Sequence, residues 1–197
     1  MRRALLPLLV LLLTVALAAC AKSSADTFSG TVLHVPYHAP ATELTDTAGK
    51  PFSLADSTDK RLTLVFFGYT HCPDECPTTM STLASAMLQL DDSDRQDVQV
   101  VFVTTDPARD TGPVIRRWLD HFSSAFVGVT GPLPTIKKVA IDVGVPIAKG
   151  RRLASGGYDV THGTQVLAMD GKNQIPVVWT LGTTAPEFAH DIHQLLS

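Results

Sequence analysis

The sequence predicts an α/β domain with a mixed central sheet flanked by helices, and three observations support this class. From residue 62 onward, short runs of β-branched and aromatic residues alternate with helical stripes of apolar residues. Near the C-terminus the turn sequence 170–173, Asp-Gly-Lys-Asn, separates two strand-like runs and indicates an antiparallel hairpin. Two cysteines, Cys72 and Cys76, stand between the first long strand and the helix that follows it.

The elements are predicted in order from these patterns. A weakly alternating segment at 27–38 is expected to pair as an edge strand, and 43–54 is expected to form a small hairpin around Gly49, an N-terminal β-hairpin extension. Two polar stretches, 91–97 and the Gly-rich basic 148–158, are expected to be loops. The remaining strands are predicted at 62–69, 98–105, 126–129, 164–169 and 175–181, and the helices at 77–90, 113–122, 133–143 and 187–196.

The cysteine pair is predicted to form a tight loop before a helix. Pro77 suits the first helical position, because its missing N–H would have no partner there, and Cys76 is then the cap. Unpaired N–H groups and the helix dipole favour thiolate at such a place. The loop could join the two sulfurs in a disulfide or hold them around one soft metal ion, and the spacing leaves both possibilities open.

The N-terminal segment resembles a bacterial lipoprotein signal. Residues 1–19 combine a short basic start with an apolar run that is short for a membrane span, and Cys20 follows Leu-Ala-Ala directly. We expect 1–19 to be a signal peptide and Cys20 to carry lipid. Residues 20–38 are then a lipidated tether and extension, and 39–197 the folded domain. An uncleaved anchor and plain secretion are the alternatives, and all three place the domain outside the cytoplasm.

Charge and length limit the function classes. Without residues 1–19 the chain carries 14 basic and 19 acidic residues, a net charge of −5, and it has no long basic run. This composition argues against nucleic acid as a partner. The remaining length suits one domain with a substantial core, and no internal repeat is evident.

A thioredoxin-like fold places its redox cysteines where Cys72 and Cys76 stand, although the spacer here has three residues instead of two. That fold has a proline before the strand that faces the cysteines. The corresponding segment here, 159–163, has no proline and carries His162. Soft thiolates select Cu(I), and imidazole suits both copper oxidation states. Two thiolates and a neutral imidazole would form a site of net charge −1 with Cu(I) and zero with Cu(II).

Three segments make the chain resemble the Sco/SenC family from about Ala41 to the C-terminus. They are Phe-Gly-Tyr-Thr-His-Cys-Pro-Asp-Glu-Cys-Pro-Thr-Thr, Thr-Thr-Asp-Pro-Ala-Arg-Asp-Thr and Tyr-Asp-Val-Thr-His-Gly-Thr. The resemblance implies a thioredoxin-like fold that binds one copper ion, Cu(I) or Cu(II), through Cys72, Cys76 and His162. It also implies that Asp106 lies near the site without being a ligand. The implied client is the subunit of cytochrome c oxidase that holds the dinuclear copper site.

Several alternatives remain open at this stage. The main one is an extracytoplasmic thiol–disulfide oxidoreductase that keeps oxidase or copper-chaperone cysteines reduced. A peroxidase-like enzyme lacks its Thr-x-x-Cys context, since Tyr69 stands three residues before Cys72. We expect His71 to be an exposed residue, with thiol tuning or a spare ligand as the alternative.

The resemblance and the signal also imply location and partners. We expect a lipid anchor on the extracytoplasmic side of a bacterial cell membrane. Besides the oxidase subunit, a second periplasmic copper chaperone or a thioredoxin-like reductase is a candidate partner. Whether the protein also acts as an enzyme is left open by the sequence.

Overall fold

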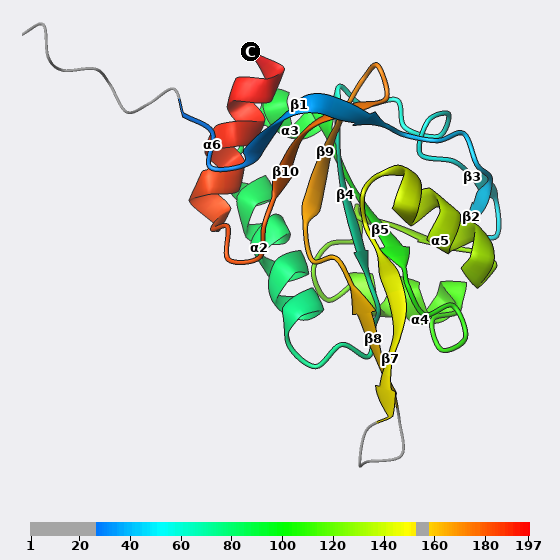
Figure 1. The fold of residues 1–197 in the computed structure, drawn as a ribbon. Helices are drawn as coiled ribbons and strands as arrows, with labels where there is room; N and C mark the ends of the chain where they lie inside the picture. The colour runs from blue at the N-terminus through cyan, green and yellow to red at the C-terminus, as the bar shows by residue number, and fades with distance from the viewer. Residues whose placement is uncertain (1–26, 153–157) are drawn as a thin grey trace, which may run out of the picture.

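The computed structural model describes residues 27–152 and 158–197. Eight of its ten strands form one sheet with the order β1–β10–β9–β4–β5–β6–β2–β3, and the other two pair only with each other (Figure 1). The pairs β4–β5 and β5–β6 are parallel and the remaining pairs antiparallel, which confirms the mixed sheet. The strands are β1 (Thr31–His38), β2 (Leu44–Asp46), β3 (Pro51–Phe52), β4 (Leu62–Gly68), β5 (Val98–Thr104), β6 (Val127–Thr130), β7 (Ile147–Arg152), β8 (Tyr158–His162), β9 (Val166–Asp170) and β10 (Gln174–Trp179).

Helices cover both faces of the sheet. Three of them, α2, α4 and α6, pack on one face, and α5 packs on the other (Figure 1). The described helices are α2 (Glu75–Gln89), α3 (Asp92–Asp97), α4 (Gly112–Leu119), α5 (Leu133–Asp142) and α6 (Ala185–Leu196). None of the helices in this part of the chain has the length and apolar character needed to cross a bilayer.

The strand that leads to the cysteines lies at the centre of the core. All seven residues of β4 are buried. Leu64 and Phe66 face α2 and α6, whereas Val65 and Phe67 face α5, as the alternation of side chains along a strand requires. A strand buried on both faces reads as an unbroken apolar run, which is why the sequence predicted it correctly. The loop after β4 is therefore attached to the most rigid part of the domain.

The predicted N-terminal elements are confirmed. Strand β1 is the edge strand of the sheet and pairs with β10. Strands β2 and β3 form the predicted hairpin, whose turn contains Gly49 with φ of 83°. Strand β2 also pairs with β6, so the hairpin extends the sheet at the edge opposite β1.

The start of α2 differs from the prediction. The helix begins at Glu75 with Asp74 as N-cap, so Cys76 lies inside the first turn and is not the cap. Pro77 is the third helical residue. It is accommodated because the first backbone bond of the helix runs from Thr78 N to Asp74 O, and the N–H groups before it have no helical partner. Proline is therefore tolerated throughout the first turn, and its position alone does not fix where the helix starts.

Two predicted loops contain regular structure. The charged stretch 91–97 includes the short helix α3, because the Asp91 side chain accepts a hydrogen bond from Asp94 N and caps it. Most of the basic stretch 148–158 belongs to a two-stranded antiparallel ribbon of β7 and β8, apart from residues 153–157, which lie outside the described part. Glycine and basic residues weakened the strand signal there, and the pairing partner is local.

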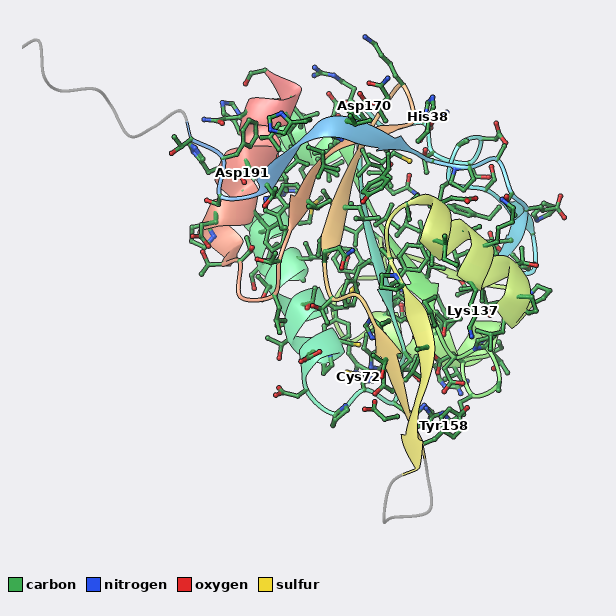
Figure 2. All side chains as sticks on the ribbon, viewed as in Figure 1. His38, Cys72, Lys137, Tyr158, Asp170 and Asp191 are labelled. Carbon is green, nitrogen blue, oxygen red and sulfur yellow. The ribbon has the colours of Figure 1, made fainter. Side chains whose placement is uncertain are left out.

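A buried carboxylate fixes the point where the N-terminal segment joins the domain. Asp191 of α6 is fully buried and accepts hydrogen bonds from Trp179 Nε1 at 2.7 Å, Gly30 N at 2.9 Å and Ser29 N at 3.1 Å. One side chain thus connects α6, β10 and the residues before β1. In Figure 2, Asp191 and Cys72 are labelled on well-separated parts of the molecule.

Candidate metal centre

The two cysteines lie on the turn that joins β4 to α2. Cys72 N donates to the Tyr69 carbonyl at 3.2 Å, which closes the turn. Cys76 N donates to Cys72 Sγ at 3.3 Å. The Cys72 sulfur therefore takes the place of a capping side chain, since Asp74 makes no side-chain cap bond. Both cysteines are free thiols.

The two thiols differ in exposure. Cys76 is fully buried against the core, whereas Cys72 is partly exposed. Gly68, the last residue of β4, makes room for the buried thiol. A Cβ at this position would lie 3.1 Å from Cys76 Sγ and 2.9 Å from the Phe66 ring. The sequence Phe-Gly before the cysteine loop thus has a steric reason.

The Cys72 and Cys76 thiols also differ in pKa. A hydrogen bond from the Cys76 thiol, assisted by backbone N–H groups, lowers the pKa of Cys72 to about 6. That bond and burial raise the pKa of Cys76 well above its ordinary value. At neutral pH the pair therefore holds one negative charge, on the more exposed sulfur, and one proton, on the buried sulfur.

The ribbon brings His162 to the buried thiol. His162 ends β8, and its Nε2 lies 3.7 Å from Cys76 Sγ, although the two residues are 86 positions apart in the sequence. Its Nδ1 lies 2.8 Å from the Gly163 carbonyl oxygen and must be the donor there. In the tautomer with the proton on Nδ1, Nε2 carries the lone pair and faces the sulfur, which is the arrangement a metal ligand needs.

The three predicted ligands converge pairwise and not yet as a set. In the described residues, the one trio of His, Cys, Asp or Glu whose ligand atoms all lie within 4.8 Å of one another is Asp91, Asp94 and His193. Cys72, Cys76 and His162 do not meet that limit together. Cys72 Sγ instead accepts the hydrogen bond from Cys76 N at the start of α2. Together the three predicted ligands offer two sulfurs and one imidazole nitrogen, a donor set that suits copper in both oxidation states.

An open cavity of about 320 Å³ leads to these residues. Cys72 and His162 line it, and Asp74 and Glu75 contribute carboxylates to its rim. Cys76 is fully buried and does not line it, so Cys72 and His162 are the donors that the cavity reaches. Figure 2 labels Cys72 at the same end of the molecule as the β7–β8 ribbon.

The two neighbouring residues that the sequence singled out have other contacts. The His71 side chain is 52% exposed, and its Nδ1 lies 3.1 Å from Thr70 Oγ1 and 3.6 Å from Asp110 Oδ1. Asp106 is buried, accepts a hydrogen bond from Tyr158 Oη at 2.6 Å and forms an ion pair with Arg109. Asp106 thus lies beneath the ribbon that carries His162. Cys20, the predicted lipidation site, lies outside the described residues.

Sequence reasoning missed a residue that supports the loop from below. Asp110 is fully buried and accepts hydrogen bonds from Thr70 N at 2.9 Å, Thr70 Oγ1 at 2.6 Å and Thr104 Oγ1 at 2.7 Å. The next residue, Thr111, is the N-cap of α4. The signal was present as the second Asp of the Asp-Pro-Ala-Arg-Asp segment, but only the fold reveals which donors it meets.

Fold and site together define a class of protein, a thioredoxin-like domain with a Cys-x3-Cys turn that faces a histidine. The model of the SCO1/SenC family matches residues 36–197. The chain belongs to this family.

Relatives and solved structures agree with this assignment. A "Putative copper-binding protein" of Stutzerimonas stutzeri is 35% identical over 123 residues, covering 62% of this chain and 59% of the relative. "Protein SCO2, mitochondrial" of Saccharomyces cerevisiae is 38% identical over 96 residues, 49% of this chain and 32% of the relative. The matches thus cover between a third and three fifths of these relatives.

Two structures share both fold and sequence with the chain. The solution structure of apo Sco1 from Thermus thermophilus has a TM-score of 0.77 and 30% identity, covering 88% of this chain and 99% of the other. The structure of Bradyrhizobium japonicum ScoI with copper bound has a TM-score of 0.69 and 30% identity, covering 81% and 97%. The thioredoxin-like fold predicted from the sequence is therefore confirmed.

Proposed function

We propose that this protein binds one copper ion through Cys72, Cys76 and His162 and assists assembly of the dinuclear copper site of cytochrome c oxidase. The observation that carries the proposal is the 3.7 Å approach of His162 Nε2 to Cys76 Sγ. Copper is the cargo in this account and arrives and leaves through the open cavity. The relatives described above support the metal, because one is named as copper-binding and another was solved with copper.

The residues have distinct roles in this proposal. Cys72 meets the ion first, since its thiol is partly exposed and its lowered pKa keeps it a thiolate. When the metal binds, it displaces the proton of the Cys76 thiol, because the form of cysteine that binds metal is the thiolate. His162 adds the nitrogen ligand that stabilises Cu(II) beside two soft sulfurs. Because the open cavity reaches Cys72 and His162, a client protein with its own thiols can take the ion over.

Copper titration of the reduced protein tests the ligand set. We expect His162→Ala to bind Cu(II) at least about 100-fold more weakly and Cu(I) no more than about tenfold more weakly, since two thiolates alone suit Cu(I). His121→Ala is the matched control, because it removes a histidine that follows α4. Absorption spectra and competition with a chelator report both affinities. Equal Cu(II) affinity of wild type and His162→Ala would contradict the proposal.

A thiol–disulfide oxidoreductase is the second candidate, and the unequal cysteines favour it. An exposed thiolate with a lowered pKa beside a buried thiol is the arrangement of an attacking and a resolving cysteine. Attack by Cys72 on a client disulfide would form a mixed disulfide, and Cys76 would then release the reduced client as Cys72–Cys76 becomes oxidised. If this is the main function, His162→Ala retains reductase activity while Cys72→Ser and Cys76→Ser lose it.

We also propose that Cys20 carries a lipid anchor on the extracytoplasmic side of the membrane. The lipobox-like sequence before Cys20 supports this, as argued from residues 1–19. Membrane fractionation and mass spectrometry of wild type and Cys20→Ser test it. We expect lipid on the wild type and misprocessed or released protein in the variant, and identical fractionation without lipid would reject the anchor.

A further inference from the structure

The strand that carries His162 is not part of the central sheet. Among the described residues, β8 pairs only with β7, and neither strand pairs with the eight-stranded sheet. Val160 and Ile147 pack against the core clusters on the two faces, which seats the ribbon. Backbone pairing with the sheet begins only at Val166 of β9, opposite Phe66, so side-chain contacts along β8 contribute to the position of His162 relative to the cysteines.

Tyr69 makes the first of these contacts. It follows β4 and is buried, and its hydroxyl donates to Asp159 Oδ1 of β8. Its ring also meets the imidazole of His162 edge-on, with ring centroids 5.9 Å apart. The Tyr69 side chain on the cysteine turn therefore contacts both the strand that carries the histidine and the histidine ring itself.

Tyr158 makes the second contact, at the other end of β8. Its hydroxyl donates to Asp106 Oδ1 at 2.6 Å, and the Arg109 guanidinium stacks on its ring with Cζ 3.9 Å from the centroid. Arg109 pairs with Asp106 and also lies 5.7 Å from the Tyr69 ring centroid. The two tyrosines are thus joined through one ion pair on the loop after β5, in which Asp106 is buried and Arg109 is partly buried.

We propose that this ribbon latch, made of Tyr69, Asp159, Tyr158, Asp106 and Arg109, positions His162 over the cysteines and so sets the affinity for Cu(II). Its members are positioning residues and not ligands. The hydroxyl contacts of Tyr69 and Tyr158 join β8 to the cysteine turn and to the loop after β5, which carries Asp106. Loss of a hydroxyl frees β8 to move while the apolar packing of Val160 keeps the domain folded. The copper part of this inference rests on the proposed function, whereas the mechanical part does not.

Metal-free protein tests the latch directly. Tyr69→Phe, Tyr158→Phe and the double variant each remove hydroxyls and keep every ring. Tyr37→Phe is the matched control, since Tyr37, the remaining tyrosine of the chain, lies on edge strand β1. We expect amide hydrogen exchange in residues 158–162 to speed up at least about tenfold in the double variant, with exchange in β4 unchanged. Unchanged exchange in residues 158–162 would overturn the latch whether or not the protein binds copper.

Copper titration then tests the positioning role. We expect Cu(II) affinity to fall about tenfold in each single variant and further in the double variant, with a change of less than about threefold for Cu(I) and for Tyr37→Phe. The Cu(II) absorption spectrum should shift toward that of His162→Ala. Faster exchange with an unchanged Cu(II) affinity and spectrum would overturn the positioning role. If wild type and His162→Ala instead bind Cu(II) alike, the ligand set itself fails, and the exchange experiment still decides the latch.

Discussion

Replacing Asp110 by alanine tests how the cysteine turn is held, and we expect it to lower the free energy of unfolding by about 3–5 kcal/mol. The buried carboxylate accepts three hydrogen bonds, two from Thr70 and one from Thr104. A bond to a charged group contributes about 1.5–3 kcal/mol, and an unpaired buried donor costs about 1–3 kcal/mol. The hydroxyls of Thr70 and Thr104 can turn toward other acceptors, so the loss of their bonds is counted at the lower end of these energy ranges. The Thr70 N–H cannot turn away.

Two further variants calibrate this prediction. Asp110→Asn keeps the shape and one accepting oxygen, so we expect a loss of about 1–2 kcal/mol. Asp120→Ala removes an exposed carboxylate that pairs with Arg116 at 2.9 Å, and we expect less than about 1 kcal/mol. Urea unfolding of the reduced, metal-free protein, followed by tryptophan fluorescence, measures all three. If Asp110→Ala loses no more stability than Asp120→Ala, the carboxylate does not support the turn and the reasoning is wrong.

Four other predictions concern the thiols, one surface histidine and one glycine. Iodoacetamide should modify Cys72 of the reduced, metal-free protein with a midpoint near pH 6 and leave Cys76 largely unmodified, and equal rates by mass spectrometry would argue otherwise. The pKa of Cys72 is depressed on folding, so its contribution to stability is present above its ordinary pKa of 9.0 and is lost as the pH falls toward about 6. The free energy of unfolding measured as a function of pH checks this. The hydrogen bond to Asp94 raises the pKa of His193, so that pair stabilises the fold fully below the ordinary pKa of 6.5 and its contribution is lost as the pH rises through the folded pKa. An NMR titration of His193 with the same midpoint in wild type and Asp94→Asn would contradict this. Gly68→Ala should lower the free energy of unfolding by about 2 kcal/mol, because the added methyl group meets Cys76 Sγ and two phenylalanine rings; an unchanged unfolding midpoint would show that these neighbours yield at no cost.

The sequence predicted well wherever a local pattern reports burial. The apolar run of β4 and the turn before β10 each identified their elements to within a few residues. The start of α2 was placed two residues late, because a proline suits any position of the first turn and a sulfur replaced the expected cap. The ribbon was missed because its strands stabilise each other and carry no apolar alternation.

The candidate site was predicted less completely, for a physical reason. Cys72, Cys76 and His162 could be named from type, spacing and family resemblance, since each is a chemically distinctive donor. Their supports could not, because Tyr69, Asp110 and Asp159 are ordinary residue types whose role depends on contacts between distant segments. Sequence separations of 40 and 90 positions give no local signal.

The junction at Asp191 has a consequence for how the domain could work while attached to a surface. If Cys20 is lipidated, Ser29 lies nine positions further along the chain, and a segment of that length reaches at most about 30 Å. A force that pulls on this segment acts on the hydrogen bonds between Ser29 and the fully buried Asp191 carboxylate of α6, away from the cysteine turn (Figure 2). Under the proposed anchoring, a pull on the N-terminal segment would therefore act on α6 and not on the turn that carries the two thiols.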